Sequence, residues 1–139
     1  MTTRVPLLLA SALVALTAMA PSVEAEVKPS RCSLKTLSGT YLYSQTGTWN
    51  GRPYSESGRE KYDGNGGIEV VRRGSDGPRQ AERGRYVISS DCIATMTYPN
   101  GFEMTSFVAR DGSRFTFTIT KAPGRLPTSI SGWEVRVND

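Results

Sequence analysis

The segment Arg114-Phe115-Thr116-Phe117-Thr118-Ile119-Thr120 decides the fold class of this chain. Its apolar residues, Phe115, Phe117 and Ile119, occupy every second position, and threonines fill the positions between and after them. Successive side chains of a β-strand point to opposite faces, so this alternation predicts a strand with one face buried and the other in water.

Similar segments recur along the chain between short turn sequences. Glycine stands next to Asp or Asn in Asp63-Gly64-Asn65-Gly66, Pro99-Asn100-Gly101 and Asp111-Gly112. These pairs adopt the positive φ of tight hairpin turns. The sequence therefore predicts eight strands, at residues 37–45, 54–62, 67–73, 80–88, 92–98, 102–110, 114–120 and 130–137.

Short links between successive strands favour an antiparallel meander, and closure into a barrel protects the edges of half-apolar strands. We expect an all-β protein, a single eight-stranded antiparallel up-and-down barrel at residues 37–139, after an N-terminal lead at 26–36. An open two-sheet sandwich is the alternative. Stable membrane insertion is not expected, because lipid-spanning strands need an apolar outer band and these strands carry Arg, Lys and Glu throughout.

Residues 1–25 have the features of a secretory signal peptide. Arg4 is the only charge before a small-to-apolar stretch at 7–20, and Val-Glu-Ala at 23–25 suits cleavage before Glu26. The stretch is shorter than the roughly 20 residues that a helix needs to cross a bilayer. We expect an exported protein, periplasmic or secreted, with a buried N-terminal helix as the alternative.

The two cysteines, Cys32 and Cys92, both follow the expected cleavage site. An oxidising compartment favours their pairing, so we expect one disulfide. Two free buried thiols are the alternative.

The composition excludes several kinds of chemistry. The chain has no histidine, which removes Ser-His-Asp catalysis and His-ligated zinc, and it has no glycine-rich phosphate motif. No metal and no cofactor are expected. The net charge is +4, but the arginines are spread along the chain apart from 72–73 and 79–85, which indicates a solvated basic face and no nucleic-acid partner.

Three stretches carry a family resemblance: CSLKTLSGTY at 32–41, YDGNG at 62–66 and GRYVISSDC at 84–92. Together they resemble small secreted bacterial proteins of the allene oxide cyclase barrel-like group, within the calycin-like eight-stranded barrels. The likeness spans roughly residues 32–120. It implies a barrel whose apolar interior holds a small hydrophobic molecule, as cyclases of the broader group do. No catalytic residue can be transferred by motif.

Glu56 and Glu60 depart from that group, in which the strand before the DGNG turn tends to be apolar at alternate positions. Both lie on the same face of the expected strand as Tyr54 and Tyr62. If that face is interior, two carboxylates enter the barrel from positions whose Cα atoms are about 13 Å apart, and Glu69 or Glu82 could approach from neighbouring strands. Desolvation would raise the pKa of an interior Glu, which could act as acid, base or ligand anchor. Alternatively, both face solvent or pair with cross-strand arginines, Arg83 or Arg85.

The inward aromatic residues are candidates for a binding pocket, although ordinary core packing explains them equally well. We expect an exported barrel that binds a small hydrophobic or amphipathic molecule without catalysis. The alternative is a cofactor-independent cyclase or isomerase, with Glu60, Glu56 or Tyr86 assisting. Outer aromatics such as Trp49 or Phe107 would permit a homo-oligomer. The candidate ligand-binding residues are Tyr41, Tyr43, Tyr62, Tyr86, Phe115, Phe117 and Trp133. Trp133 is expected to face the interior together with Val135 and Val137, because the three alternate along the last strand.

Overall fold

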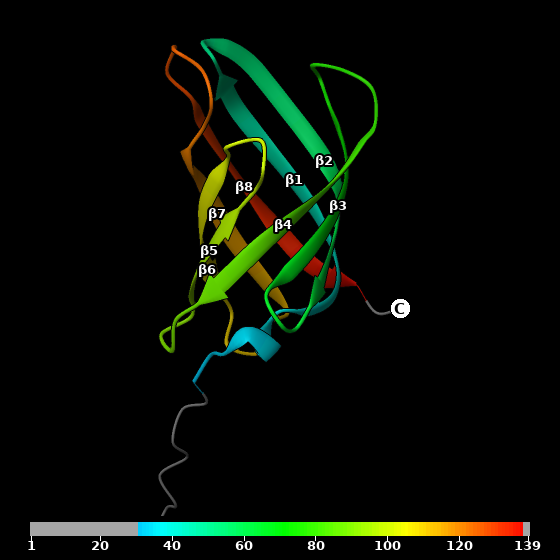
Figure 1. Ribbon diagram of the computed structural model, residues 1–139, viewed down its shortest axis with the longest axis vertical. Helices are drawn as coiled ribbons and strands as arrows, with labels where there is room; N and C mark the ends of the chain where they lie inside the picture. Colours follow the sequence, from blue (N-terminus) through cyan, green and yellow to red (C-terminus); the bar gives the residue numbers. More distant parts are fainter. Residues whose placement is uncertain (1–30, 138–139) are drawn as a thin grey trace, which may run out of the picture.

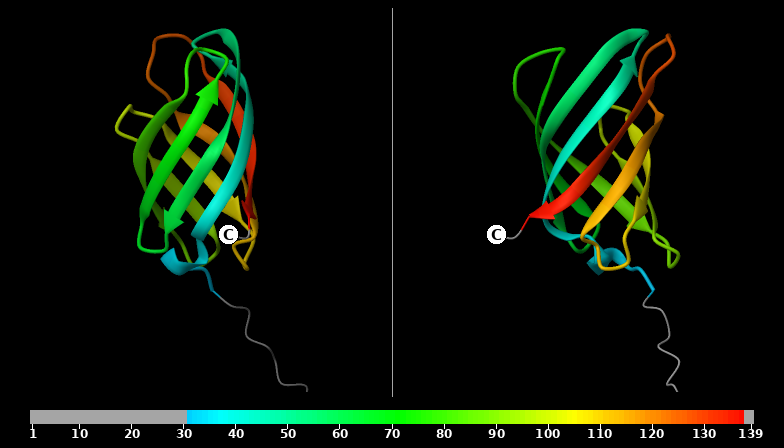
Figure 2. Two further views of the ribbon diagram at one scale, coloured as in Figure 1. Left: turned by 90° about the vertical axis from the view of Figure 1, so that its right-hand side faces the viewer. Right: turned by 180° about the vertical axis from the view of Figure 1, so that it is seen from behind.

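The computed structural model describes residues 31–137, which form a closed antiparallel β-barrel (Figures 1 and 2). Each strand pairs with its neighbours in sequence, and β8 pairs with β1 to close the barrel. The predicted all-β up-and-down barrel is confirmed, and the sandwich alternative is wrong. The elements are η1 (Leu34–Thr36), β1 (Ser38–Trp49), β2 (Arg52–Asp63), β3 (Gly67–Gly74), β4 (Gln80–Ile88), β5 (Ile93–Thr97), β6 (Glu103–Val108), β7 (Arg114–Lys121) and β8 (Ser129–Val137).

The expected signal peptide and its cleavage site before Glu26 lie outside the described residues. Within residues 31–137, no helix has the length and apolar character needed to cross a membrane. The described part of the N-terminal lead contains the short 3₁₀ helix η1.

The first hairpin is longer than the sequence pattern predicts. β1 and β2 each have 12 residues and remain paired up to Trp49 and Arg52. Asn50 and Gly51 reverse the chain between them, with φ of 52° and 76°. An Asn-Gly pair with positive φ at both positions is typical of a two-residue hairpin turn. The hairpin tip forms part of the upper end of the barrel as drawn in Figure 1.

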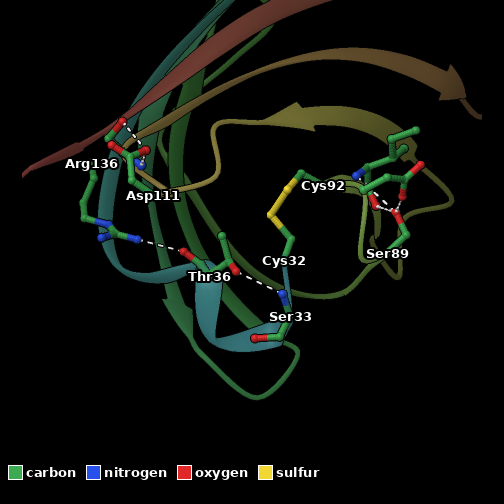
Figure 3. Close-up of a disulfide and its surroundings, with 10 residues drawn as sticks. Cys32, Ser33, Thr36, Ser89, Cys92, Asp111 and Arg136 are labelled. Carbon is green, nitrogen blue, oxygen red and sulfur yellow. Dashed lines mark hydrogen bonds between the residues drawn. A yellow bond between two sulfur atoms is a disulfide. The ribbon is translucent and has the colours of Figure 1, made fainter. Parts of the chain in front are cut away.

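A disulfide and the segment around η1 close the lower end of the barrel (Figures 1 and 3). The predicted Cys32–Cys92 bridge is confirmed; it ties the chain before η1 to the loop before β5. The Arg136 guanidinium donates a hydrogen bond to the Thr36 carbonyl at 2.8 Å. The Tyr86 hydroxyl donates to the Leu37 carbonyl at 2.9 Å. These contacts hold the lead against strands that are distant in sequence.

Aromatic rings fill the lower half of the barrel. Tyr62 packs edge-on against Tyr41, Tyr86 and Phe115, with ring centroids 5.1, 5.4 and 6.0 Å apart. All four side chains are buried. The Tyr41 hydroxyl also donates to the Gly112 carbonyl at 2.5 Å, in the loop between β6 and β7. The lower half is therefore a solid core, and any internal cavity must lie above it.

The orientation of β8 differs from the prediction. Trp133 and Val135 are 52% and 42% exposed on the outer face, while Glu134 between them is 1% exposed. The expected inward position of Trp133 and Val135 is thus wrong. The reason is the register between β7 and β8, in which Gly132 lies opposite the inward residue Phe117. Because Gly132 has no side chain, the ring of Phe117 fits against the backbone of β8. Alternation along β8 then places Trp133 outside.

Candidate functional site

A cavity occupies the upper half of the barrel, above the aromatic core. It has a volume of about 500 Å³ with its open mouth included, and the centre of a water molecule can move through about 50 Å³ of it. Its apolar lining comes from Met104 of β6, Phe117 and Ile119 of β7, Ile130 of β8 and Val70 of β3. Its polar lining is formed mainly by Tyr43, Glu56, Glu60, Arg72, Tyr98 and Glu134. We call this cavity the cup.

Glu56 of β2 is the centre of the upper polar cluster. Its Oε1 accepts hydrogen bonds from the Tyr43 hydroxyl at 2.6 Å and from Gln45 Nε2 at 2.8 Å. Its Oε2 accepts from the Tyr54 hydroxyl and from Arg72. Burial and the neighbouring carboxylate raise the pKa of Tyr43, so this phenol remains a donor at all ordinary pH values. Four donors thus satisfy a carboxyl group that is only 6% exposed.

Arg72 of β3 connects this cluster to the mouth of the cup. Besides the ion pair with Glu56, its Nε lies 3.1 Å from Glu82 Oε1, and its Nη2 donates to Gln80 Oε1 at 2.6 Å. Glu82 also accepts from Asn100 Nδ2 at 2.8 Å. The guanidinium therefore bridges two carboxylates at the side of the cup.

Glu60 and Glu134 form a second carboxyl pair deeper in the barrel. Glu60 is 3% exposed; its Oε2 accepts from the Tyr62 hydroxyl at 2.5 Å and its Oε1 from the Tyr98 hydroxyl at 2.9 Å. Glu134 Oε2 lies 3.4 Å from the same Tyr62 hydroxyl. Glu134 Oε1 is buried and accepts no hydrogen bond from a donor group of the described residues.

The protein interior keeps both carboxyls of this pair protonated above the usual range of a glutamate. Burial raises the pKa of Glu60 to about 7, against the opposite effect of the Tyr62 and Tyr98 hydroxyls, which donate to its ionised form. Burial and the charge of Glu60 raise the pKa of Glu134 well above its usual range. Two carboxyl groups in contact in a low-dielectric site cannot both ionise cheaply, so the pair retains a proton at pH values where free glutamates have lost theirs.

Some of the predicted site residues meet in the cup. Glu56, Glu60, Tyr43 and Phe117 line it. The alternative that both glutamates face solvent is wrong, because both are buried inside the barrel. Tyr98 also lines the cup, and its hydroxyl donates a hydrogen bond to Glu60.

Other predicted residues do not line the cup. Tyr41, Tyr86 and Phe115 belong to the aromatic core below it, and Tyr62 meets the cup only through its hydroxyl contacts with the two carboxyls. Trp133 is on the outer face. Of the two additional acids considered, Glu82 reaches the cup through Arg72, whereas Glu69 is exposed and lies 3.4 Å from Arg83.

Sequence analysis missed Glu134, Arg72 and Gln45 as parts of the site. In β8 both faces carry apolar residues, Ile130 inside and Trp133 outside, so the alternation pattern allowed either orientation. Gly132 was the available signal, since a glycine in a strand often marks a close approach of another group. Arg72 was treated as part of a solvated basic run.

The fold and the site define a small closed β-barrel with a carboxyl-rich cup. Among the described residues, no cluster of three or more acidic or cysteine side chains is arranged to hold a metal ion. No family model matches the chain, and no curated protein matches it. Among solved structures, the chain is similar to the crystal structure of Rv2717c from M. tuberculosis, with a TM-score of 0.37 and 14% identity over 76% of this chain and 95% of that chain.

Proposed function

We propose that this protein binds a small amphipathic molecule in the cup and does not transform it. The observation that carries the proposal is the mixed lining of the cup. Phe117, Ile119 and Ile130, on β7 and β8, offer apolar surface, and the same cavity is lined by Glu60 and Glu134. Small-molecule sites commonly combine an apolar lining with a few placed polar groups.

The size of the cup restricts the ligand. The aromatic core below Glu60 limits the depth that a ligand can reach. The centre of a water molecule can reach only about 50 Å³ of the cup. The enclosed part is therefore small, and a long molecule would extend through the mouth.

The resemblance to the allene oxide cyclase barrel-like group and the signal-peptide features of residues 1–25 support an exported location for this activity. In that setting the protein would take up its ligand from the periplasm or the extracellular medium. Binding is favoured over catalysis because the donors around Glu56 are all engaged within the protein.

The test is native mass spectrometry of protein exported by a bacterial host, compared with its denatured mass. We expect an added mass that is lost on denaturation. Ile119→Trp, which places a ring in the cup, should abolish the added mass. The matched control Thr118→Trp adds the same ring to the exposed outer face of β7 and should retain it. A bare mass for the wild-type protein, repeated after incubation with mixed lipid and polyketide extracts, would overturn the proposal.

A cyclase or isomerase is the second candidate, and the acid–base properties of Glu60 are the observation that favours it. Its pKa of about 7 suits a general acid or base, and the hydroxyl of Tyr98 lies 2.9 Å from it. Once a ligand is known, the two functions separate readily. A ligand recovered chemically unchanged after long incubation supports binding alone, whereas conversion that Glu60→Gln abolishes while leaving affinity intact supports the enzyme.

A further inference from the structure

We propose that the polar end of the ligand is a primary ammonium group, which binds between Glu60 and Glu134 at the base of the cup, with its alkyl chain along Phe117 and Ile119. This inference rests on the proposed function and specifies the chemical class of the ligand. It depends on an unpartnered carboxyl oxygen, on the charge of the cup and on its shape.

Glu134 Oε1 is the first observation. It is a buried oxygen of a side chain that lines the cup, and apart from the Glu60 carboxyl no group among residues 31–137 is placed to donate a hydrogen bond to it. A buried acceptor without a donor is costly. The other lining atom without a hydrogen bond, Arg72 Nε, lies 3.1 Å from Glu82 Oε1, so the ligand is the natural source of the donor that Glu134 lacks.

The charge balance of the cup is the second observation. Arg72 is the only basic side chain in its lining, and Glu56 and Glu82 both contact it. That cluster carries one excess negative charge, and ionisation of Glu60 or Glu134 adds to it. A cup with this charge in a low-dielectric interior attracts a cation and disfavours a carboxylate or phosphate.

The acceptor geometry favours a primary ammonium over other cations. An ammonium has three N–H donors, and acceptor oxygens converge here from β2 and β8, in Glu60 and Glu134. The hydroxyl oxygen of Tyr98, which donates its own proton to Glu60, is a further acceptor. A quaternary ammonium has no N–H to offer Glu134 Oε1.

The test uses n-butylamine as the probe, with n-butanol as a neutral molecule of the same chain length. Dissociation constants are measured by calorimetry and by chemical-shift titration for the wild type and Glu134→Gln. The control variant Glu69→Gln removes an exposed acid that lies outside the cup. Ile119→Trp, which fills the cup, tests where the probe binds. If Glu134→Gln does not give a folded spectrum, Glu60→Gln replaces it.

We expect butylammonium to bind at least about tenfold more tightly than butanol, and Glu134→Gln to weaken only the amine, by about tenfold or more. Glu69→Gln should change neither constant, and Ile119→Trp should abolish binding. The ammonium inference would be overturned if both probes bound with equal affinity, if Glu134→Gln changed neither affinity and if Ile119→Trp abolished the binding of both. That result would leave the proposed function intact. Amine binding that persists in Ile119→Trp, or no binding of either probe, would also overturn the inference. The native mass experiment then decides the proposed function separately.

Discussion

Trp133 and Glu134 are consecutive residues of β8 that face opposite sides of the barrel wall. The indole is 52% exposed, and the carboxyl group beside it is 1% exposed inside the barrel. An apolar ring in water and an acid in the interior reverse the usual distribution of these residue types. Burial raises the pKa of Glu134 well above its usual range, and strongly perturbed pKa values cluster at functional sites.

The stability of the protein should fall as the pH rises through the range in which Glu60 ionises. The ordinary pKa of this carboxyl is 4.5, and burial raises it to about 7 in the folded protein. Between these values the folded state binds more protons than the unfolded state, so the free energy of unfolding decreases with rising pH, by about 3 kcal/mol for this group. Urea unfolding at a series of pH values measures the decrease.

Glu60→Gln should reduce that decrease, since an amide does not titrate. The groups facing Glu60 that also influence the profile are Glu134, Glu56, Tyr62 and Tyr98. Glu69→Gln, at an exposed position, should leave the profile unchanged. A Glu60→Gln profile as steep as that of the wild type would contradict the assignment of the titration to this carboxyl.

Removing the disulfide should destabilise the barrel without changing its architecture. The bridge joins residues separated by 60 positions, and the chain-entropy estimate for a loop of this length is about 4 kcal/mol. We expect the double variant Cys32→Ser, Cys92→Ser to lose about that much free energy of unfolding in urea, with a β-rich circular dichroism spectrum retained. A loss below about 1 kcal/mol would show that the unfolded chain is already constrained.

Gly132→Ala should be destabilising because β8 approaches its neighbours closely at this position. A Cβ atom at Gly132 would lie 2.6 Å from the Phe117 ring and 2.9 Å from Gln45 Cβ. Such overpacking costs about 1–3 kcal/mol. Gly77→Ala is the control, since a Cβ there meets nothing within 4 Å. Equal melting temperatures for the two variants would mean that Phe117 and the neighbouring strand move aside at little cost, which would contradict the prediction.

Arg72→Met should destabilise the protein much more than Arg83→Met. Arg72 pairs with Glu56, whose side chain is 4% exposed, whereas Arg83 and Glu69 form a pair with side chains 85% and 62% exposed. Removing one partner of a buried pair leaves an uncompensated charge, at a cost of about 3 kcal/mol, and an exposed pair contributes less than about 1 kcal/mol. Chemical denaturation of both variants at neutral pH measures the difference. Similar losses would contradict a structural role for the Arg72 bridge.

The fold class was readable because each of its determinants is local. Alternation at Phe115, Phe117 and Ile119 requires only the geometry of one strand, and Asp63-Gly64-Asn65-Gly66 requires only the geometry of one turn. The first hairpin was predicted too short because Asn50-Gly51 was not used as its turn. Hydrophobic alternation also fades beyond Gln45, where β1 residues 46–48 are exposed.

The carboxyl pair could not be predicted because its members meet only through closure of the barrel. Tyr62 and Glu134, whose side chains meet beside Glu60, are 72 positions apart in sequence. Their meeting depends on the pairing of β1 with β8 and on the orientation of β8. A shift of one residue in that register would reverse which side of the wall each side chain faces.

Strand alternation, turn residues and the number of cysteines are local features, so they specify the eight strands, their antiparallel order and the pairing of Cys32 with Cys92. Which face of β8 is inside, and with it the cup, depends on contacts that exist only in the folded barrel. Packing of Phe117 against Gly132 selects that face. The same choice buries Glu134 beside Glu60 and leaves Trp133 in water.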